Sequence, residues 1–284
     1  MNIEIDTNCC TCCMLCVQDC VYGVFREIDG KPVPAQPLLC NLCSHCIAVC
    51  PHGAIRHDRL DVEQIHKVDK KKIDASTYRE IVLGRRSVRH YKDKPVPREV
   101  MEEILDLARY SPTAGNDQRV GYIVIQDKQE IRDISRAVFQ SIVRIHTLAR
   151  NPFMKLLLKP FKLLPDRYLR LMDYVREQHE STGRDYVLYD APALILLHAP
   201  KKERFAAGNC SIAATNIMNY AHAMGLGTCC TGFMTMALQK KGKLRDKFSI
   251  SKTRDVFASL VMGYPAYLHT NTVSRKKPDI RWER

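Results

Sequence analysis

The 284-residue chain contains no apolar run close to the ~18 residues that a membrane-spanning helix needs. Its first ten residues, MNIEIDTNCC, have neither a basic nor an apolar segment, so we expect no secretory signal peptide. No zinc-finger or aromatic RNA-binding signature accompanies the net charge of +13, so we expect no nucleic-acid partner. These absences favour a cytoplasmic protein whose positive charge steers acidic protein partners.

Cysteine is scarce over most of the chain and concentrated near its start. Ten of the thirteen cysteines lie between Cys9 and Cys50, and the others are Cys210, Cys229 and Cys230. The odd total and the lack of a signal peptide argue against a secreted disulfide scaffold. Thiolates that bind metal in a reducing cytoplasm fit this distribution better.

The N-terminal cysteines follow one spacing twice. CNLCSHCIAVCP, residues 40–51, has cysteines at steps of three, three and four before a proline. CTCCMLCVQDC, residues 10–20, repeats these steps thirty residues earlier, and Gly23 and Gly53 continue the register. The duplicated run resembles the two-cluster ferredoxins of bacteria, with zinc as the competing metal for paired cysteines.

The resemblance to ferredoxins implies two 4Fe–4S clusters that exchange ligands between the repeats. One cluster would be held by Cys10, Cys13, Cys16 and Cys50. The other would be held by Cys20, Cys40, Cys43 and Cys46. Val21 replaces the proline of the first repeat, and Cys9 and Cys12 are surplus, since a frame that uses them breaks the spacing. We expect His45 to be a hydrogen-bonding neighbour or a solvated residue rather than a ligand.

The chain changes in composition after residue 60. Residues 59–77 are polar and charged. We therefore expect residues 1–66 to form a ferredoxin domain, residues 67–77 a linker and residues 78–284 a second domain.

The second domain alternates patterns of helices and strands. A helix is predicted after Pro97 from the spacing of Met101, Ile104, Leu105 and Ala108. Short apolar runs at 121–127, 191–199 and 256–265 predict buried strands. A second helix is predicted over 211–227, capped by Gly225, with one face formed by Ile212, Asn216, Ile217, Tyr220, Ala221 and Met224. This alternation predicts a sheet covered by helices.

Apolar and basic residues are interleaved over 151–172, a pattern also found in helices that lie on membranes. Pro160 and Pro165 would break such a helix. We therefore favour a helical insertion near 135–189 that packs over the core without membrane contact.

Four segments, in order, resemble the nitroreductase family of flavin enzymes. They are RRSVR (85–89), SPTAGNDQ (111–118), AHAMGLGTCCTGF (221–233) and MGYPAYLHTNTVSRKKPDIRW (262–282). Together with the ferredoxin-like N-terminal region, the resemblance covers nearly the whole chain. It implies an α+β protein, in which a small dicluster ferredoxin-like domain precedes an α/β sandwich with a mixed sheet covered by helices.

The resemblance to nitroreductases also implies an FMN site. The phosphate and ribityl chain would be held by Arg85, Arg86, Ser87 and Arg89, with Arg275 or Lys276 closing the site. The turn that lies against the isoalloxazine in the family matches Pro112, Thr113, Ala114 and Asn116. The segment that offers backbone N–H groups to the flavin N5 edge matches Thr231 and Gly232. The alternation of guanidinium and hydroxyl donors over 85–89 suits convergence on a phosphate.

Together these features predict an FMN-dependent oxidoreductase of the nitroreductase type. Single electrons would pass through two clusters to FMN, which would reduce a nitroaromatic, a quinone or a similar conjugated acceptor. No separate catalytic side chain is predicted, because the flavin N5 carries the chemistry.

The electron donor would be an acidic low-potential protein such as ferredoxin, or NAD(P)H, although no GxGxxG motif occurs. The family implies a homodimer. Two alternatives stay open: a dehalogenase or flavin-modifying enzyme on the same scaffold, and a non-catalytic electron-transfer or redox adaptor.

Overall fold

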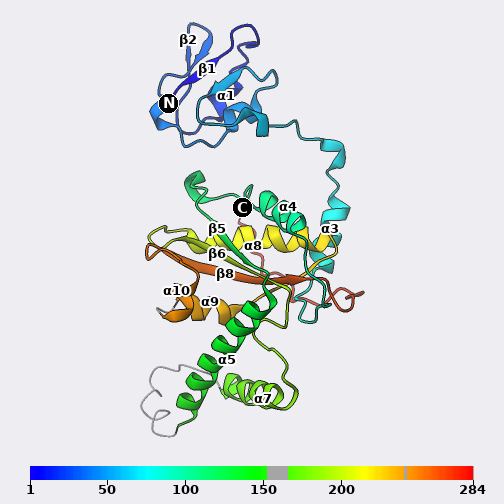
Figure 1. The fold of residues 1–284 in the computed structure, drawn as a ribbon. Helices are drawn as coiled ribbons and strands as arrows, with labels where there is room; N and C mark the ends of the chain where they lie inside the picture. The colour runs from blue at the N-terminus through cyan, green and yellow to red at the C-terminus, as the bar shows by residue number, and fades with distance from the viewer. Residues whose placement is uncertain (152–165, 240–241, 284) are drawn as a thin grey trace. The chain divides into compact units, whose positions relative to one another are not determined.

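A computed structural model describes residues 1–151, 166–239 and 242–283 of the chain (Figure 1). Contacts between residues divide it into two units. The first comprises Met1–Asp74 and Thr113–Asp117, and the second comprises Ala75–Pro112 and Gln118–Arg284. No helix in the described part of the chain is long and apolar enough to cross a membrane.

The backbone of the first unit repeats at the thirty-residue interval of its cysteines. Helix α1, Leu15–Asp19, recurs as α2, His45–Val49. Positive φ angles recur in three pairs of residues, which are Cys12 and Leu42, Met14 and Ser44, and Gly23 and Gly53. The duplication read from the sequence is therefore also a duplication of local structure.

Two short antiparallel strand pairs accompany these helices. Strand β1, Ile3–Ile5, pairs with β4, Ile55–His57, and β2, Arg26–Ile28, pairs with β3, Lys31–Val33. The buried core between them consists of Ile3, Cys16, Val24, Phe25, Ile47 and Ile55. Units shorter than ~70–80 residues rarely obtain enough stability from such a core alone, so metal ligation suits this unit.

The remaining elements of the first unit are single 3₁₀ turns. They are η1 (Pro37–Leu39), η2 (Val62–Gln64), η3 (Lys70–Lys72) and η4 (Ala114–Asn116).

The second unit contains a four-stranded sheet with the order β5-β6-β8-β7. Its strands are β5 (Gly121–Ile125), β6 (Ala193–Pro200), β8 (Arg254–Gly263) and β7 (Gly227–Cys230). Neighbouring strands are antiparallel. A parallel bridge between Ser87 and Thr228 of β7 adds a parallel contact to this antiparallel sheet, in line with the mixed sheet that the family resemblance implies.

Helices cover both faces of this sheet (Figure 1). Helices α4, Arg98–Ala108, and α8, Ala206–Ala223, pack on one face. Helices α5, Lys128–Arg150, and α9, Gly232–Gln239, pack on the other. The predicted strands correspond to β5, β6 and β8, and the predicted helices to α4 and α8.

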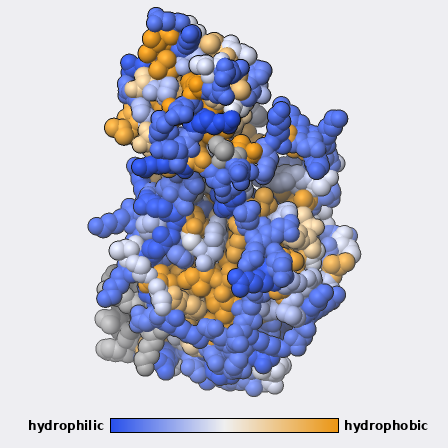
Figure 2. Space-filling view, turned by 45° about the horizontal axis from the view of Figure 1, so that its top comes forward, coloured by the Kyte–Doolittle hydropathy of each residue, from blue (hydrophilic) through white to orange (hydrophobic). Residues whose placement is uncertain are grey.

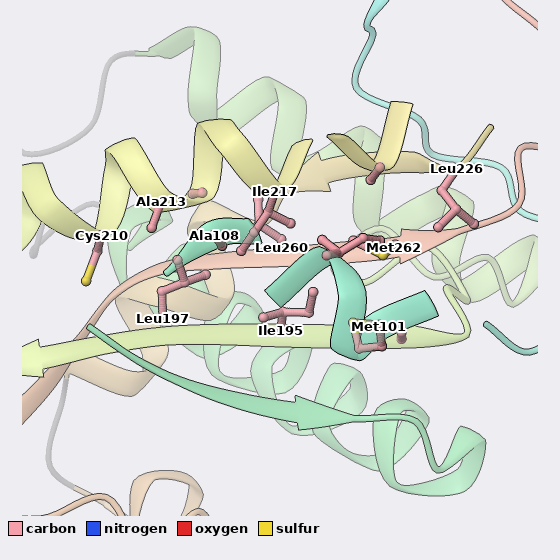
Figure 3. Close-up of a cluster of buried hydrophobic side chains, with 14 of the residues drawn as sticks. Met101, Ala108, Ile195, Leu197, Cys210, Ala213, Ile217, Leu226, Leu260 and Met262 are labelled. Atoms are coloured by element: carbon pink, nitrogen blue, oxygen red, sulfur yellow. The ribbon is translucent and has the colours of Figure 1, made fainter. Parts of the chain in front are cut away.

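Strand β6 separates the two cores, because successive side chains of a strand point to opposite faces. Ile195 and Leu197 belong to the core against α4 and α8, where Figure 3 shows them together with Ile217 of α8 and Leu260 of the neighbouring strand β8. The intervening residue Leu196 belongs to the core against α5 and α9.

Three further helices complete the second unit, namely α3 (Ala75–Gly84), α7 (Asp166–Thr182) and α10 (Lys243–Lys247). Within the expected insertion near 135–189, residues 135–150 belong to α5 and residues 166–182 form α7, whereas residues 183–189 are not helical. Buried His146 joins these helices, since its Nε2 lies 3.2 Å from Leu169 O. Residues 152–165, which contain Pro160 and Pro165, lie outside the described residues.

Candidate functional site

The eight predicted metal ligands line two cavities of the first unit, four in each. The first cavity is lined by Cys10, Cys13, Cys16 and Cys50. The second cavity is lined by Cys20, Cys40, Cys43 and Cys46. The fourth cysteine of each repeat thus faces the cavity of the other repeat. The fold brings together the same two sets that the ferredoxin resemblance implies.

The donors at these cavities fit iron–sulfur clusters. Among the described residues, no three His, Cys, Asp or Glu side chains gather closely enough to hold a single ion. The four predicted thiols instead line the wall of each cavity, and the surplus Cys9 joins them in the first. A cluster is held by thiolates on its separate iron atoms.

Backbone N–H groups already point at several of these sulfur atoms. Leu42 N–H lies 3.4 Å from Cys40 Sγ, and at the equivalent place in the first repeat Cys12 N–H lies 3.5 Å from Cys10 Sγ. Ala54 N–H lies 3.3 Å from Cys50 Sγ. Such hydrogen bonds stabilise negative charge on sulfur, as thiolate ligation requires.

Burial opposes ionisation of the innermost thiols. It raises the pKa of Cys46 to about 11 and also raises the pKa of Cys16. Metal ligation needs the thiolate, so loading of either cavity would release protons.

Two histidines lie near the second cavity in different environments. The side chain of His45 is 65% exposed and lies 3.5 Å from Asp19 Oδ2. His57 is buried, and its Nε2 lies 3.6 Å from Cys40 Sγ. Sequence reasoning considered His45 and missed His57, which lies outside both cysteine runs and follows no spacing that would identify it.

The predicted phosphate-binding segment runs beside β7 in the second unit. Ser87 forms the parallel bridge to Thr228, and Val88 N–H donates to Thr228 O at 3.0 Å. Val88 is buried, whereas Ser87 and Arg89 are exposed, as expected for alternating residues of an extended segment.

Arg85, Ser87 and Arg89 gather around Cys229 of β7. Burial raises the pKa of the Cys229 thiol, while Arg89, Ser87 and Arg85 act to lower it. Within the described residues, no carboxylate pairs with Arg85 or Arg89, and Arg85 Nη1 has Met218 Sδ at 4.0 Å. Two guanidinium groups without acidic partners fit a phosphate group.

Arg86 is used differently from its neighbours. Its guanidinium donates to Leu83 O and Gly84 O at the end of α3. A basic side chain at this position satisfies terminal carbonyl groups and opposes the negative end of the helix dipole.

The backbone of Thr231 is already engaged in the sheet. Thr231 N–H donates to Ser259 O at 2.9 Å, and its hydroxyl donates to Ser259 Oγ at 3.0 Å. Gly232 begins α9, and the first N–H groups of a helix have no partner within it. Gly232 N–H is therefore the donor of this pair that suits a ligand.

The other predicted flavin residues lie in less structured segments. Arg275 and Lys276 are exposed in the tail after β8, and none of the hydrogen bonds between described residues joins them to Arg85 or Arg89. Pro112 belongs to the second unit, whereas Thr113, Ala114 and Asn116 group with the first.

Comparison with known proteins decides the family. A sequence model of the nitroreductase family matches residues 82–264. The chain belongs to the nitroreductase family. The family and the α+β fold class predicted from the four segments are thereby confirmed.

Individual relatives resemble different parts of this nitroreductase-family oxidoreductase. A protein of Methanothermobacter thermautotrophicus, named for NADH dehydrogenase and NAD(P)H nitroreductase activity, is 26% identical over 191 residues, covering 66% of this chain and 76% of its own. A ferredoxin of Methanocaldococcus jannaschii is 42% identical over 59 residues, covering 20% of this chain and 94% of its own. The N-terminal region is therefore ferredoxin-like.

A solved structure supports the fold of the second unit. The FMN-bound nitroreductase of Bacteroides fragilis aligns with a TM-score of 0.54 at 19% identity, covering 72% of this chain and 98% of that protein.

Proposed function

We propose that the chain is an oxidoreductase that passes single electrons through two 4Fe–4S clusters to FMN and on to a nitroaromatic, a quinone or a similar conjugated acceptor. The pair of cysteine-lined cavities, each drawing ligands from both repeats, carries this proposal. When bound, the clusters supply one-electron transfer and FMN supplies exchange of one or two electrons.

The second unit would hold the flavin by its phosphate. Arg85 and Arg89 bind the phosphate charge, and the Ser87 hydroxyl adds a neutral donor between them. By the family resemblance, Arg275 or Lys276 would close the site, and the Gly232 N–H would serve as donor to the N5 edge. By the same resemblance, the ring system would lie against Pro112, Thr113, Ala114 and Asn116. The FMN seen in the Bacteroides fragilis nitroreductase supports this choice of cofactor.

The electron donor would be an acidic low-potential protein such as a ferredoxin, because the chain carries a net charge of +13. NAD(P)H is the alternative donor, and it is supported by the name of the Methanothermobacter relative. No disulfide joins cysteines of the described residues, which suits a reducing cytoplasm. We also propose a homodimer, with residues 1–66 as the electron-entry domain, 67–77 as the linker and 78–284 as the flavin domain.

Cofactor analysis tests the proposal directly. Anoxically purified protein should contain about eight iron and eight sulfide per chain, as two 4Fe–4S clusters require, together with one FMN. Cys43→Ala should lose about half of the iron and should abolish reduction of FMN by the protein donor. Cys12→Ala, which removes a surplus thiol from the equivalent loop, is the matched control and should retain both.

Two results would contradict this assignment. Unchanged donor-driven FMN reduction in Cys43→Ala would remove the clusters from the electron path. Iron without flavin would leave a ferredoxin module attached to a protein without the proposed reductase activity.

A further inference from the structure

The two cysteine cavities differ in a contact that the thirty-residue repeat does not reproduce. His57 is the last residue of β4, and its side chain has no exposure to solvent. Its Nε2 lies 3.6 Å from Cys40 Sγ in the wall of the second cavity. The residue thirty positions earlier is Glu27, which lies exposed on β2. The first cavity also has a histidine in its lining, His52, but that residue is exposed. No buried histidine equivalent to His57 is therefore among the described residues that line the first cavity.

The surroundings of His57 determine which ring nitrogen carries the proton. Arg59 N–H donates to His57 Nδ1 at 3.1 Å, so Nδ1 must accept in the neutral ring. Asp58 Oδ1 is a more distant neighbour of the same nitrogen, at 3.5 Å. A neutral His57 with Nδ1 as acceptor carries its hydrogen on Nε2 and directs it at the Cys40 sulfur.

A buried N–H donor affects the charge balance at a ligating sulfur. Reduction adds a negative charge to a cluster, and hydrogen bonds to its sulfurs are among the determinants of its potential. Water cannot replace the donor at a side chain without solvent exposure, and a hydrogen bond is electrostatically stronger in such surroundings. The Nε2–H group therefore favours the reduced state of the cluster that Cys40 ligates.

We propose that His57 is a positioning residue that raises the reduction potential of the cluster in the second cavity and leaves the other cluster unaffected. This inference rests on the proposed function, because it requires that both clusters are present. Backbone N–H groups contact sulfurs in both cavities, at Cys10 and Cys50 in the first and at Cys40 in the second. Removal of the His57 donor alone isolates its effect from theirs.

Redox titration of the anoxically purified full-length protein, followed by electron paramagnetic resonance, tests the inference. In His57→Phe, which keeps a ring but removes the N–H, one cluster should become harder to reduce, with its midpoint shifted to lower potential. The midpoint of the other cluster should not move. His57→Gln, which keeps a side-chain N–H, should recover part of the shift.

His45→Gln is the matched control, because His45 also lines the second cavity but is exposed and paired with Asp19. Its two midpoints should equal those of the wild type. Two unshifted midpoints in an iron-replete His57→Phe protein, or an equal shift in His45→Gln, would overturn the inference while leaving the proposed function intact. Wild-type protein without iron would overturn both.

A measurement on the wild type covers the case in which His57→Phe fails to assemble its clusters. Protein labelled with [¹⁵N]histidine should show a nitrogen coupling to one of the two reduced clusters in pulsed electron paramagnetic resonance. Two iron-replete, reduced clusters without such a coupling would overturn the role of His57.

Discussion

Arg85 and Arg89 are the residues on which the proposed FMN phosphate site chiefly depends. Both lie near Cys229, and neither is neutralised by a carboxylate among the described residues. Salt bridges elsewhere in the unit show the contrast, since Arg245 Nη1 lies 2.5 Å from Asp255 Oδ1. A guanidinium group without a carboxylate partner is suited to an anionic ligand.

Removal of either guanidinium should weaken FMN binding. For Arg85→Ala and for Arg89→Ala we expect a loss of roughly 1.5–3 kcal/mol, the scale of a charged hydrogen bond. This corresponds to an increase in Kd of about 10- to 150-fold, measured by flavin fluorescence titration of the apoprotein. Arg79→Ala, on exposed α3 and paired with Glu80, is the control and should bind normally. Normal FMN retention in both site variants would refute the phosphate assignment.

Prediction from sequence worked at the residue scale where chemistry imposes a spacing. The regular spacing of the cysteines matched that of ferredoxins, and this resemblance implied two sets of four metal ligands. The fold places each set around one cavity. Arg86 and Thr231 match the family segments equally well, yet their donors serve α3 and Ser259. Hydrogen-bond competition of this kind depends on neighbours that are distant in sequence, and so does the burial of His57.

Close packing between Val88 and Gly227 holds the predicted phosphate-binding segment, residues 85–89, against β7. A Cβ atom added to Gly227 would lie 2.5 Å from Val88 Cγ2 and 2.7 Å from Val88 Cβ. Val88 also donates its N–H to Thr228 O. A side chain at position 227 would therefore push the strand away from the residues that flank Val88.

Gly227→Ala should disturb both folding and flavin binding. We expect the overpacked contact to cost about 1–3 kcal/mol in unfolding free energy and to weaken FMN binding, because Ser87 and Arg89 move with Val88. Denaturant unfolding and flavin titration measure the two effects. Gly208→Ala, in α8 with no atom within 4 Å of the added Cβ, should instead gain about 0.5–1 kcal/mol. Equal stabilities of the two variants would contradict this prediction.

The elements predicted from sequence were those with a strong apolar pattern. Strand β7 was missed because its sequence, GTCC, is short and does not alternate, and its position is determined by pairing with β8. The predicted face of α8 was partly wrong, since Ile212 is 41% exposed. The face that packs on the sheet is made of small residues such as Ala213 and Ala214, which hydropathy distinguishes poorly. The predicted Gly225 cap is confirmed by its φ of 78°.

The charge of the whole molecule makes the nature of the donor testable. The chain has 44 lysines and arginines against 31 aspartates and glutamates. Charge steering acts over the Debye length, which falls from about 30 Å at 0.01 M salt to about 10 Å at 0.1 M. The rate of reduction by an acidic ferredoxin should therefore fall steeply over this range in stopped-flow measurements. A rate independent of salt would exclude electrostatic steering of the donor.

Exposed apolar surface of the second unit is relevant to assembly. Figure 2 shows an apolar area on this unit among hydrophilic surroundings. Exposed apolar side chains occur on both faces of the unit, with Phe205 and Ile212 at α8 and Met236 at α9. Contiguous apolar surface on a folded chain commonly marks a contact with another protein.

Light scattering tests the proposed homodimer. The molar mass in solution should be twice the chain mass of 32.5 kDa, because apolar surface favours association with a second copy. Dilution should leave this mass unchanged down to micromolar concentration if the dimer is stable. The mass of one chain at every concentration would contradict the proposal.

The exchange of cysteine ligands between the two repeats determines how the first unit would lose its structure when a cluster is destroyed. Cys50 closes the first cavity and Cys20 closes the second, so each cofactor would tether both repeats. Oxidative destruction of either cluster would then free one end of each repeat rather than a single loop. Since the core holds few buried side chains, the unit has little else to retain its shape. Loss of one cluster should therefore make the whole first unit susceptible to proteolysis. Proteolysis would then destroy the remaining cluster as well, so a damaged molecule could no longer accept electrons.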